Sequence, residues 1–283
     1  MKTHKDVMMI YPRKSLINNG FEWLKEEGRK AGLEVSTELD DTVGLDISGG
    51  VSLTVSGVSR PLPDIVVMRC YDASLSAAFE SLGVRVVNTT VSMMQAYNKG
   101  LTHVALASAS IPMPETLWSV APDYEAARSR FGARFVVKSP VGSKGEKVWL
   151  VSSQRDYDAV VPLCEGGVVA QRYVEEAAGS DMRLWVIGGR VAASVRRIGC
   201  GDFRSNYSLG GRIEPCTPTD RQVSLATRAA KVLGLEFAGV DIMESAAGPL
   251  VCEVNGNAGF RSVSALGTAN IPACLFDYLA QLP

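Results

Sequence analysis

The decisive stretch of this chain reads Gly239-Val240-Asp241-Ile242-Met243 and, after a polar turn, Leu250-Val251-Cys252-Glu253-Val254-Asn255. Two β-type runs flank the turn Ser245-Ala246-Ala247-Gly248, a pattern that predicts a β-hairpin. Strand alternation places Glu253 and Asn255 on one face of the hairpin. Antiparallel pairing brings Asp241 opposite Glu253, or one place diagonal to it. The hairpin therefore gathers two carboxylates and an amide oxygen among apolar residues.

This convergence of like charges predicts a bound cation. Buried carboxylates repel each other and are costly unless a cation joins them. Hard oxygen ligands suit Mg²⁺, which takes one or two carboxylates and shares the rest of its coordination shell with substrate phosphates. A polar hairpin edge is the alternative, but the apolar neighbours on both sides favour the metal site. Nucleotide chemistry is thus the first functional hypothesis.

Length and composition bound the class of protein. The 283 residues, of which 46% are hydrophobic, can build a substantial core, and the formal net charge of −1 gives no electrostatic footprint for nucleic acid or for a membrane. Six scattered cysteines without a C-x-x-C pair indicate reduced thiols, and only two histidines disfavour a histidine-based zinc site. The apolar run Val7–Tyr11 is too short for a signal peptide, and no stretch reaches membrane-spanning length. We therefore expect a cytoplasmic protein with neither nucleic acid nor membrane as a partner.

The N-terminal part alternates predicted strands and helices. Apolar runs predict strands at residues 6–11, 64–69 and 84–88, and helical periodicity predicts helices at about 15–31 and 73–82. Such alternation is typical of a parallel sheet with helices on its faces. The Gly- and Ser-rich residues 43–57 predict a loop or an edge hairpin.

The rest of the chain predicts two lobes of mixed helices and strands. Helices are expected at about 91–108, 219–233 and 272–282, and strands at 135–138, 147–151 and 168–174. Residues 181–187 and 190–197 join through Gly188-Gly189, a good hairpin signal. We therefore predict an α/β fold with a parallel-sheet N-terminal domain and two α+β lobes, and domains at 1–90, 91–170 and 171–283.

Two polar loops are candidates for ligand binding. Lys138 ends a buried strand, and the following loop contains Gly142, Ser143 and Gly145, whose backbone N–H groups can cradle phosphate oxygens. It is not a Walker A loop, and the alternative is an ordinary hairpin with surface lysines. The second loop, residues 199–212, is long enough for a functional segment, and a solvated loop is its alternative.

Taken in order, these pieces resemble the ATP-grasp superfamily and, within it, the RimK-like carboxylate–amine ligases. The resemblance covers about residues 85–262 and is carried by short motifs: Val87-Asn88, Asn98-Lys99, Ile111-Pro112-Met113-Pro114, Phe135-Val136-Val137-Lys138, the loop Gly142–Gly145, Gln171-Arg172-Tyr173-Val174, Gly179-Ser180-Asp181-Met182-Arg183, Gly201–Asn206, Leu209-Gly210-Gly211, Gly239-Val240-Asp241 and Glu253-Val254-Asn255. Each motif is weak alone, and their order and spacing make the match strong. The fold that it implies is the ATP-grasp fold, in which an N-terminal parallel-sheet domain precedes two α+β lobes that clamp ATP.

The resemblance implies a role for most of these residues. Contacts with the nucleotide are implied for Lys99, Lys138, Ser143, Gly145, Ser205, the adenine hinge Gln171, Arg172, Tyr173 and Val174, and Asp181 at the ribose. Arg204 and Asn206 would approach the γ-phosphate and the reacting carboxylate. Asp241, Glu253 and Asn255 would hold two Mg²⁺ ions, with Mn²⁺ as an alternative metal. Arg183 and Arg261 are proposed to contact the substrate. On the pattern alone, a surface ion pair with Asp181 explains Arg183 better, and Arg261 is equally well read as a surface arginine.

The activity implied is amide-bond formation between a carboxylate and an amine through an acylphosphate, with release of ADP and phosphate. The substrate would be an amino acid or peptide, or a protein C-terminus, and related ligases assemble as homodimers or homotetramers. This chain departs from its relatives at the hinge, where Arg172 replaces a common acidic residue, and after Asn255, where a Ser-Pro-Gly turn is common. The second departure keeps a small-molecule natural-product amide or peptide ligase open as an alternative. A non-catalytic nucleotide-binding regulatory module is a third reading, but it would not need all three metal ligands.

Overall fold

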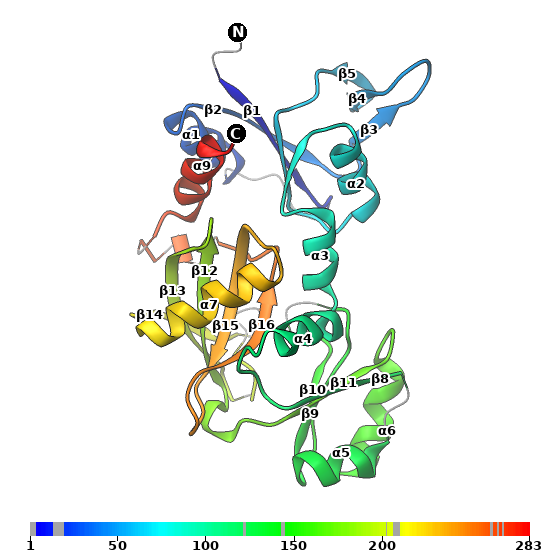
Figure 1. Ribbon diagram of the computed structural model, residues 1–283, viewed down its shortest axis with the longest axis vertical. Helices are drawn as coiled ribbons and strands as arrows, with labels where there is room; N and C mark the ends of the chain where they lie inside the picture. The colour runs from blue at the N-terminus through cyan, green and yellow to red at the C-terminus, as the bar shows by residue number, and fades with distance from the viewer. Residues whose placement is uncertain are drawn as a thin grey trace. The chain divides into compact units, whose positions relative to one another are not determined.

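The computed structural model describes residues 4–13, 20–120, 123–142, 145–201, 203–205, 210–260, 263–264, 266–267 and 269–283 (Figure 1). The chain forms two compact units, one of residues 1–93 with 259–283 and one of residues 94–258. Each unit has its own sheets and its own core.

The first unit is built on a four-stranded parallel sheet, as the alternation of strands and helices predicts. Its order is β2-β1-β6-β7, with β1 (Lys5–Tyr11), β2 (Leu33–Leu39), β6 (Ile65–Met68) and β7 (Arg85–Val87). The helices of this unit are α1 (Gly20–Lys30), α2 (Ala73–Ser81) and α9 (Ile271–Gln281). Strand β2 is absent from the sequence prediction because it lies at the sheet edge, where only Leu33 and Val35 are buried.

A small antiparallel sheet belongs to the same unit. It consists of β3 (Val43–Asp46), β4 (Ser52–Val55) and β5 (Val58–Arg60). The hairpin β3–β4 confirms the second of the two predictions for residues 43–57. Leu53 and Val55 bury their side chains in the core that also contains Val66 and Phe79, so the hairpin is anchored by one apolar face.

The C-terminal helix groups with the N-terminal residues, whereas the sequence prediction places it in a domain at 171–283. Helix α9 contacts α1, and residues 259–283 cluster with residues 1–93. The apolar face of α9 explains this, because Ile271, Leu275, Phe276 and Leu279 are all fully buried. An apolar helical stripe of this kind must pack against another element.

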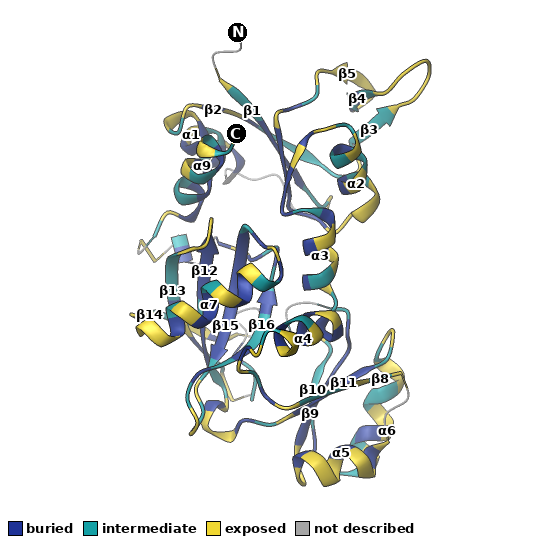
Figure 2. Ribbon diagram, viewed as in Figure 1, coloured by how far each residue is buried: buried dark blue, intermediate teal, exposed yellow. Residues whose placement is uncertain are grey.

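The second unit contains two antiparallel sheets. The first has the order β10-β9-β11-β8, with β8 (Thr116–Ser119), β9 (Phe135–Lys138), β10 (Val148–Val151) and β11 (Val168–Arg172). It packs against α5 (Tyr124–Phe131) and α6 (Gln154–Val160) through an aromatic core of Tyr124, Phe131, Phe135 and Tyr157. Figure 2 shows these helices buried on the side of the core and exposed on the other. The 3₁₀ turns η1 (Val161–Leu163) and η2 (Glu175–Ala177) flank β11.

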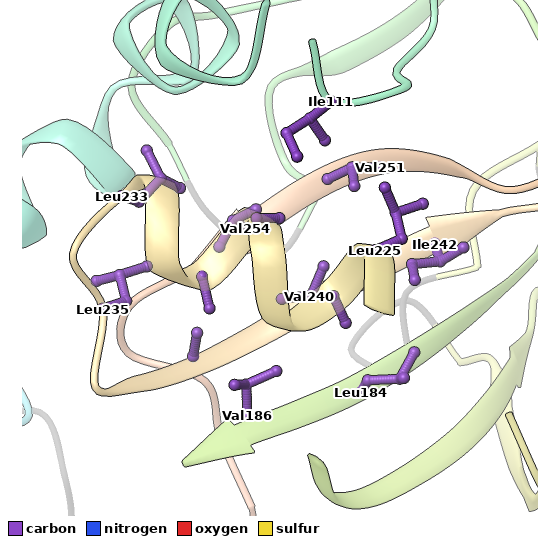
Figure 3. Close-up of a cluster of buried hydrophobic side chains, with 14 of the residues drawn as sticks. Ile111, Leu184, Val186, Leu225, Leu233, Leu235, Val240, Ile242, Val251 and Val254 are labelled. Atoms are coloured by element: carbon purple, nitrogen blue, oxygen red, sulfur yellow. The ribbon is translucent and has the colours of Figure 1, made fainter. Parts of the chain in front are cut away.

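The second sheet of this unit has five strands in the order β14-β13-β12-β15-β16. These are β12 (Ser180–Ile187), β13 (Arg190–Ile198), β14 (Arg212–Pro215), β15 (Phe237–Met243) and β16 (Leu250–Asn255). Helix α7 (Asp220–Val232) covers one face, and Figure 3 shows Leu225 and Leu233 facing Val240, Ile242 and Val254. Because strand side chains alternate, Asp181 and Arg183 of β12 and Asp241 of β15 point to the other face.

The single helix predicted at 91–108 is two helices. Helix α3 (Thr90–Tyr97) ends before Asn98, and α4 (Lys99–Ser108) begins after it. Asn98 has extended φ/ψ, and its side chain accepts hydrogen bonds from the N–H groups of Gly100 and Leu101. Asparagine is among the best N-cap residues, and its capping geometry interrupts the helix. This break fixes the position of Lys99 in the first turn of α4.

Candidate functional site

A cavity lies between the two sheets of the second unit. It is lined from β9, β10 and β11 on one side and from β12, β13, β15 and β16 on the other. Six basic and three acidic side chains line it among the described residues. The basic residues are Lys99, Lys138, Lys147, Arg172, Arg197 and Arg204, and the acidic ones are Asp181, Asp241 and Glu253. A concave site with such an excess of positive charge suits a polyanionic ligand.

Two of the lysines are buried in the cavity wall. The Lys99 backbone N–H donates to Pro140 O and its Nζ donates to Gly142 O, each at 2.8 Å, so the start of α4 is tied to the Gly-rich loop. Burial lowers the pKa of Lys99, and the nearby charge of Glu253 opposes this effect. Lys138 Nζ donates to Gln171 Oε1 at 2.7 Å. The structure thus brings together both lysines that were predicted to meet the phosphates.

The hinge residues lie at the end of β11: Gln171 and Arg172 are its last two residues, and Tyr173 and Val174 follow it. Gln171 is buried and its side chain faces Lys138 and Thr116, whereas the Arg172 side chain turns outward and pairs with Glu115. Tyr173 packs edge-to-face on Phe203, with ring centroids 6.2 Å apart. All four residues from Gln171 to Val174 line the cavity. The departure from relatives at Arg172 therefore concerns a side chain that pairs at the surface rather than one that fills the site.

The hairpin β15–β16 has the predicted register, with Asp241 directly opposite Glu253. A β-bulge between Asp241 and Ile242 adds Cys252 to the strand, so Cys252 and Glu253 both line the cavity. Val251 and Val254 face the core. Asn255 lies opposite Gly239, and its Nδ2 is buried without a hydrogen-bond partner among the described residues. The hairpin thus presents two carboxylates and an unsatisfied amide on one side.

The charge of Asp241 is already balanced by two arginines. Arg183 Nε donates to Asp241 Oδ1 at 2.6 Å, and Arg183 Nη2 and Arg197 Nη2 each donate to Oδ2 at 2.7 Å. Burial alone would raise the pKa of Asp241, but the charges of Arg183 and Arg197 outweigh it and lower the pKa. The predicted contact of Arg183 with substrate therefore competes with its bonds to Asp241, and Arg183 does not line the cavity.

This donor set still fits a magnesium ion. A carboxylate has about four lone-pair sites, and the arginines occupy three on Asp241, which leaves one on Oδ1. Glu253 lies opposite Asp241 with its side chain 29% exposed, and among the described residues its Oε1 makes a single long contact, 3.9 Å from Lys99 Nζ. Within the described residues no group of three His, Cys, Asp or Glu side chains could hold a metal. A site here would therefore need Asn255 and phosphate oxygens to complete its shell.

Asp181 and the loop after β13 form the far side of the cavity. Arg197 donates from Nε and Nη2 to the two oxygens of Asp181, and Ser205 Oγ donates to Asp181 Oδ2 at 2.5 Å. Both oxygens of Asp181 therefore accept protein hydrogen bonds at the position predicted to meet the ribose. Arg204 Nη1 donates to Gly145 O at 2.6 Å, which joins this loop to the Gly-rich loop.

Several residues of interest lie outside these expectations. Ser143, Asn206 and Arg261 fall outside the residues that the structure describes. Three residues near the lysines or the carboxylates, Arg197, Cys252 and His103, were not predicted from the sequence. Cys252 lies 3.8 Å from Lys138 Nζ, and burial raises the pKa of its thiol to about 11. Of these three, only Arg197 could have been found from the sequence, because it lies two residues before the predicted loop 199–212 and follows Arg196 in a predicted strand. None of the helices in the described part of the chain is long and apolar enough to cross a membrane.

Comparison with known proteins identifies the family that this chain resembles in sequence. A family model described as the RimK-like ATP-grasp domain matches residues 96–279. The chain is 34% identical over 230 residues to a probable alpha-L-glutamate ligase of Methanococcoides burtonii, which covers 77% of this chain and 76% of that protein. It is 30% identical over 273 residues to a probable alpha-L-glutamate ligase of Psychromonas ingrahamii, which covers 91% and 90%.

A solved structure has the same fold. It is the ATP-grasp ligase PsnB complexed with a phosphomimetic variant of its minimal precursor, Mg and ADP, with a TM-score of 0.73, 22% identity and coverage of 96% of this chain and 97% of that one. The family match spans more than half of the chain and includes every charged residue that lines the cavity. The chain belongs to the RimK-like ATP-grasp family and is an ATP-dependent carboxylate–amine ligase.

Proposed function

We propose that the second unit binds ATP with Mg²⁺ in the cavity between its two sheets and that the enzyme uses L-glutamate as one of its two substrates. The cavity supports the first part of the proposal. Basic side chains outnumber acidic ones in its lining, and β15 and β16 contribute the carboxylates of Asp241 and Glu253. The names of the two curated relatives support glutamate.

The chain's own residues would divide the work by charge. Lys99, Lys138 and Arg204 would contact phosphate oxygens and offset the negative charge that develops during phosphoryl transfer. Gln171 to Val174 would border the adenine with main-chain groups, and Asp181 would stand at the ribose side. Ser143, Gly145 and Ser205 would complete the phosphate environment, and Asn206 would approach the reacting carboxylate.

Asp241 Oδ1, Glu253 and the amide oxygen of Asn255 would hold Mg²⁺. We infer room for two ions, with Mn²⁺ able to replace them. The metal, when bound, would supply positive charge that offsets the charge of the phosphate groups. Arg183 and Arg261 remain proposals as substrate contacts.

The reaction would run in two displacements. An oxygen of the substrate carboxylate forms a bond to the γ-phosphorus while the bond from that phosphorus to the β–γ bridging oxygen breaks, so ADP leaves. The amine then attacks the acyl carbon and loses a proton, and inorganic phosphate leaves with the electrons of the acyl C–O bond. No protein nucleophile is required, so the protein contributes mainly position and charge.

A substrate screen tests this proposal. The enzyme is incubated with ATP, Mg²⁺, L-glutamate and a panel of small acids, amines, peptides and proteins with free C-termini, and ADP release and new amide masses are measured. We expect ADP and an amide only when Mg²⁺, L-glutamate and a matching partner are all present. The control variant Glu253→Gln should give neither. Amide formation with other amino acids but not with L-glutamate would reject glutamate as the substrate. If no pair of substrates led to release of ADP, the proposed function would be rejected.

A further inference from the structure

A row of four charged side chains, three of them buried, crosses the second sheet at the wall of the cavity. Asp181 and Arg183 are two residues apart on β12 and so share one face. Arg197 on β13 lies opposite Asp181, and Asp241 on β15 lies opposite Arg183. Two positive and two negative groups therefore alternate over three neighbouring strands, and the four charges balance.

Arg197 is the centre of this row. Its guanidinium donates to both oxygens of Asp181 and to Asp241 Oδ2, so one side chain joins the two acids. Its residue is only 5% exposed. Burial lowers the pKa of Arg197, but the charges of Asp241 and Asp181 and their hydrogen bonds prevail and raise the pKa. The planar fork of arginine suits such bridging, and lysine offers no equivalent geometry.

The row also reaches the loop that carries Arg204. Ser205 is buried and its Oγ donates to Asp181 Oδ2, on the oxygen that Arg197 Nη2 also contacts. The neighbouring Arg204 donates to Gly145 O. A continuous path therefore runs from Asp241 through Arg197 and Asp181 to the loop at the phosphate end of the cavity.

We propose that Arg197 is a positioning residue that sets the orientation of Asp241 and, through Asp181 and Ser205, the position of the Arg204 loop. This rests on the proposed function, in which Asp241 holds Mg²⁺ and Arg204 meets phosphate. Side chains that orient a metal ligand from behind commonly alter metal affinity about 10- to 100-fold when they are replaced. The metal site and the phosphate loop are then assembled together.

The test measures binding rather than turnover. Dissociation constants of a non-hydrolysable ATP analogue are determined by calorimetry, once with Mg²⁺ and once with EDTA, for the wild-type enzyme, Arg197→Lys and Ser205→Ala. Arg196→Lys is the matched control, because Arg196 is the adjacent residue on β13, points to the other face of the sheet and is itself exposed. Thermal unfolding without ligand shows that each variant is folded.

We expect Arg197→Lys to reduce the Mg²⁺-dependent gain in affinity about tenfold or more and to change the affinity in EDTA much less. Arg196→Lys should behave as the wild type. Ser205→Ala should weaken binding of the analogue, and the double variant should lose no more than Arg197→Lys alone, because both substitutions act through Asp181.

Equal losses with Mg²⁺ and with EDTA in Arg197→Lys, or additive losses in the double variant, would overturn the proposal. An unaltered Arg197→Lys would do the same. A wild-type enzyme that fails to bind the analogue would instead reject the proposed function, so the two failures are distinct. Arg197→Met is the second variant: it should show the same Mg²⁺-specific loss if it folds, and if it does not fold, the result of Arg197→Lys decides the test.

Discussion

Lys138 Nζ donates a hydrogen bond of 2.7 Å to Gln171 Oε1, and the same amide donates from Nε2 to Thr116 Oγ1 at 2.9 Å. The side chain of Gln171 is thus used to hold a lysine, on a strand adjacent to its own. If Gln171 belongs to the adenine hinge as proposed, its main chain rather than its side chain would meet the nucleotide base.

Replacing Gln171 with leucine should therefore weaken ATP binding through Lys138. A hydrogen bond to a charged group contributes about 1.5–3 kcal/mol, so the KM for ATP should rise about tenfold or more while kcat falls less. Steady-state kinetics against ATP concentration measure the effect. Thr116→Val removes the hydrogen bonds of Thr116 Oγ1 with Gln171 Nε2 and Pro114 O but leaves the bond between Lys138 and Gln171; it is the control and should give a smaller rise in KM. An unchanged KM in Gln171→Leu would show that Lys138 is held by other groups.

Glu253→Gln is the cleanest test of the metal site. Glu253 is partly exposed, and its one ionic contact within the described part of the chain is the 3.9 Å contact with Lys99, so the substitution should leave folding nearly intact. Loss of the carboxylate should lower turnover at least about 100-fold and remove the Mg²⁺-dependent gain in nucleotide affinity. Excess Mn²⁺ should restore part of the activity.

Asp241→Asn offers a contrast at the same site. Asp241 is buried and balances Arg183 and Arg197, so its loss should also destabilise the fold by about 3–5 kcal/mol. Chemical denaturation of the two variants side by side separates the roles. Equal stability of both variants would contradict the buried charge network.

The pH dependence of stability should report on His103. Burial, with the charges of Lys138 and Lys99, lowers the pKa of His103 to about 3. Because the unfolded chain takes up a proton near pH 6.5 and the folded chain does not, stability falls as pH decreases through that range. The loss should be about 1.4 kcal/mol between about pH 7.5 and about pH 5.5.

Urea unfolding of His103→Gln should show a correspondingly flatter profile. The chain has only one other histidine, His4, which is exposed, so His4→Gln is a direct control and should keep the wild-type profile. If His103→Gln and the wild type lose stability equally as the pH decreases, the assignment of His103 as a buried neutral side chain is wrong.

Gly100 lies where the first turn of α4 meets Trp118. A Cβ atom at Gly100 would stand 2.4 Å from two carbons of the Trp118 ring, so Gly100→Ala must displace either the ring or the helix. We expect a loss of about 1–3 kcal/mol of stability and a higher KM for ATP, since Lys99 precedes this glycine. Adding Trp118→Leu should recover much of both. A double variant as defective as Gly100→Ala would show that the ring is not the obstacle.

Arg172→Ala should have little effect. Its side chain is paired with Glu115 at the surface, where ion pairs contribute about 0–1 kcal/mol, and the hinge is proposed to act through its main chain. The KM for ATP should change by less than about twofold. Glu115→Ala should match it. A large rise in KM for Arg172→Ala alone would assign the guanidinium to the nucleotide.

The sequence predicts those features that depend on local patterns. The turns at Ser245–Gly248 and Gly188-Gly189 place both hairpins of the second sheet, and the first of them also gives the register of Asp241 with Glu253. Short strands without a clear alternation, such as Thr116–Ser119, escape prediction because only tertiary packing defines them.

Contacts between distant segments are also beyond a local pattern. Nothing in the sequence says that Gln171 meets Lys138, or that Arg197 bridges Asp181 and Asp241, because each contact depends on the pairing of strands that are far apart in the chain. Asparagine is a common N-cap residue, so the sequence allowed a helix to begin after Asn98. The apolar periodicity from 91 to 108 nevertheless predicted one continuous helix and hid the break between α3 and α4.

The surplus of basic side chains in the cavity also has a kinetic consequence. A field focused by low-dielectric walls draws an anion in before any contact is made, and dissolved ions weaken it. Arrival of ATP should therefore slow as ionic strength increases, while a neutral adenosine should arrive at a rate that salt leaves unchanged. The ionic strength of the cell should therefore influence how quickly this ligase binds a new ATP molecule after each turnover.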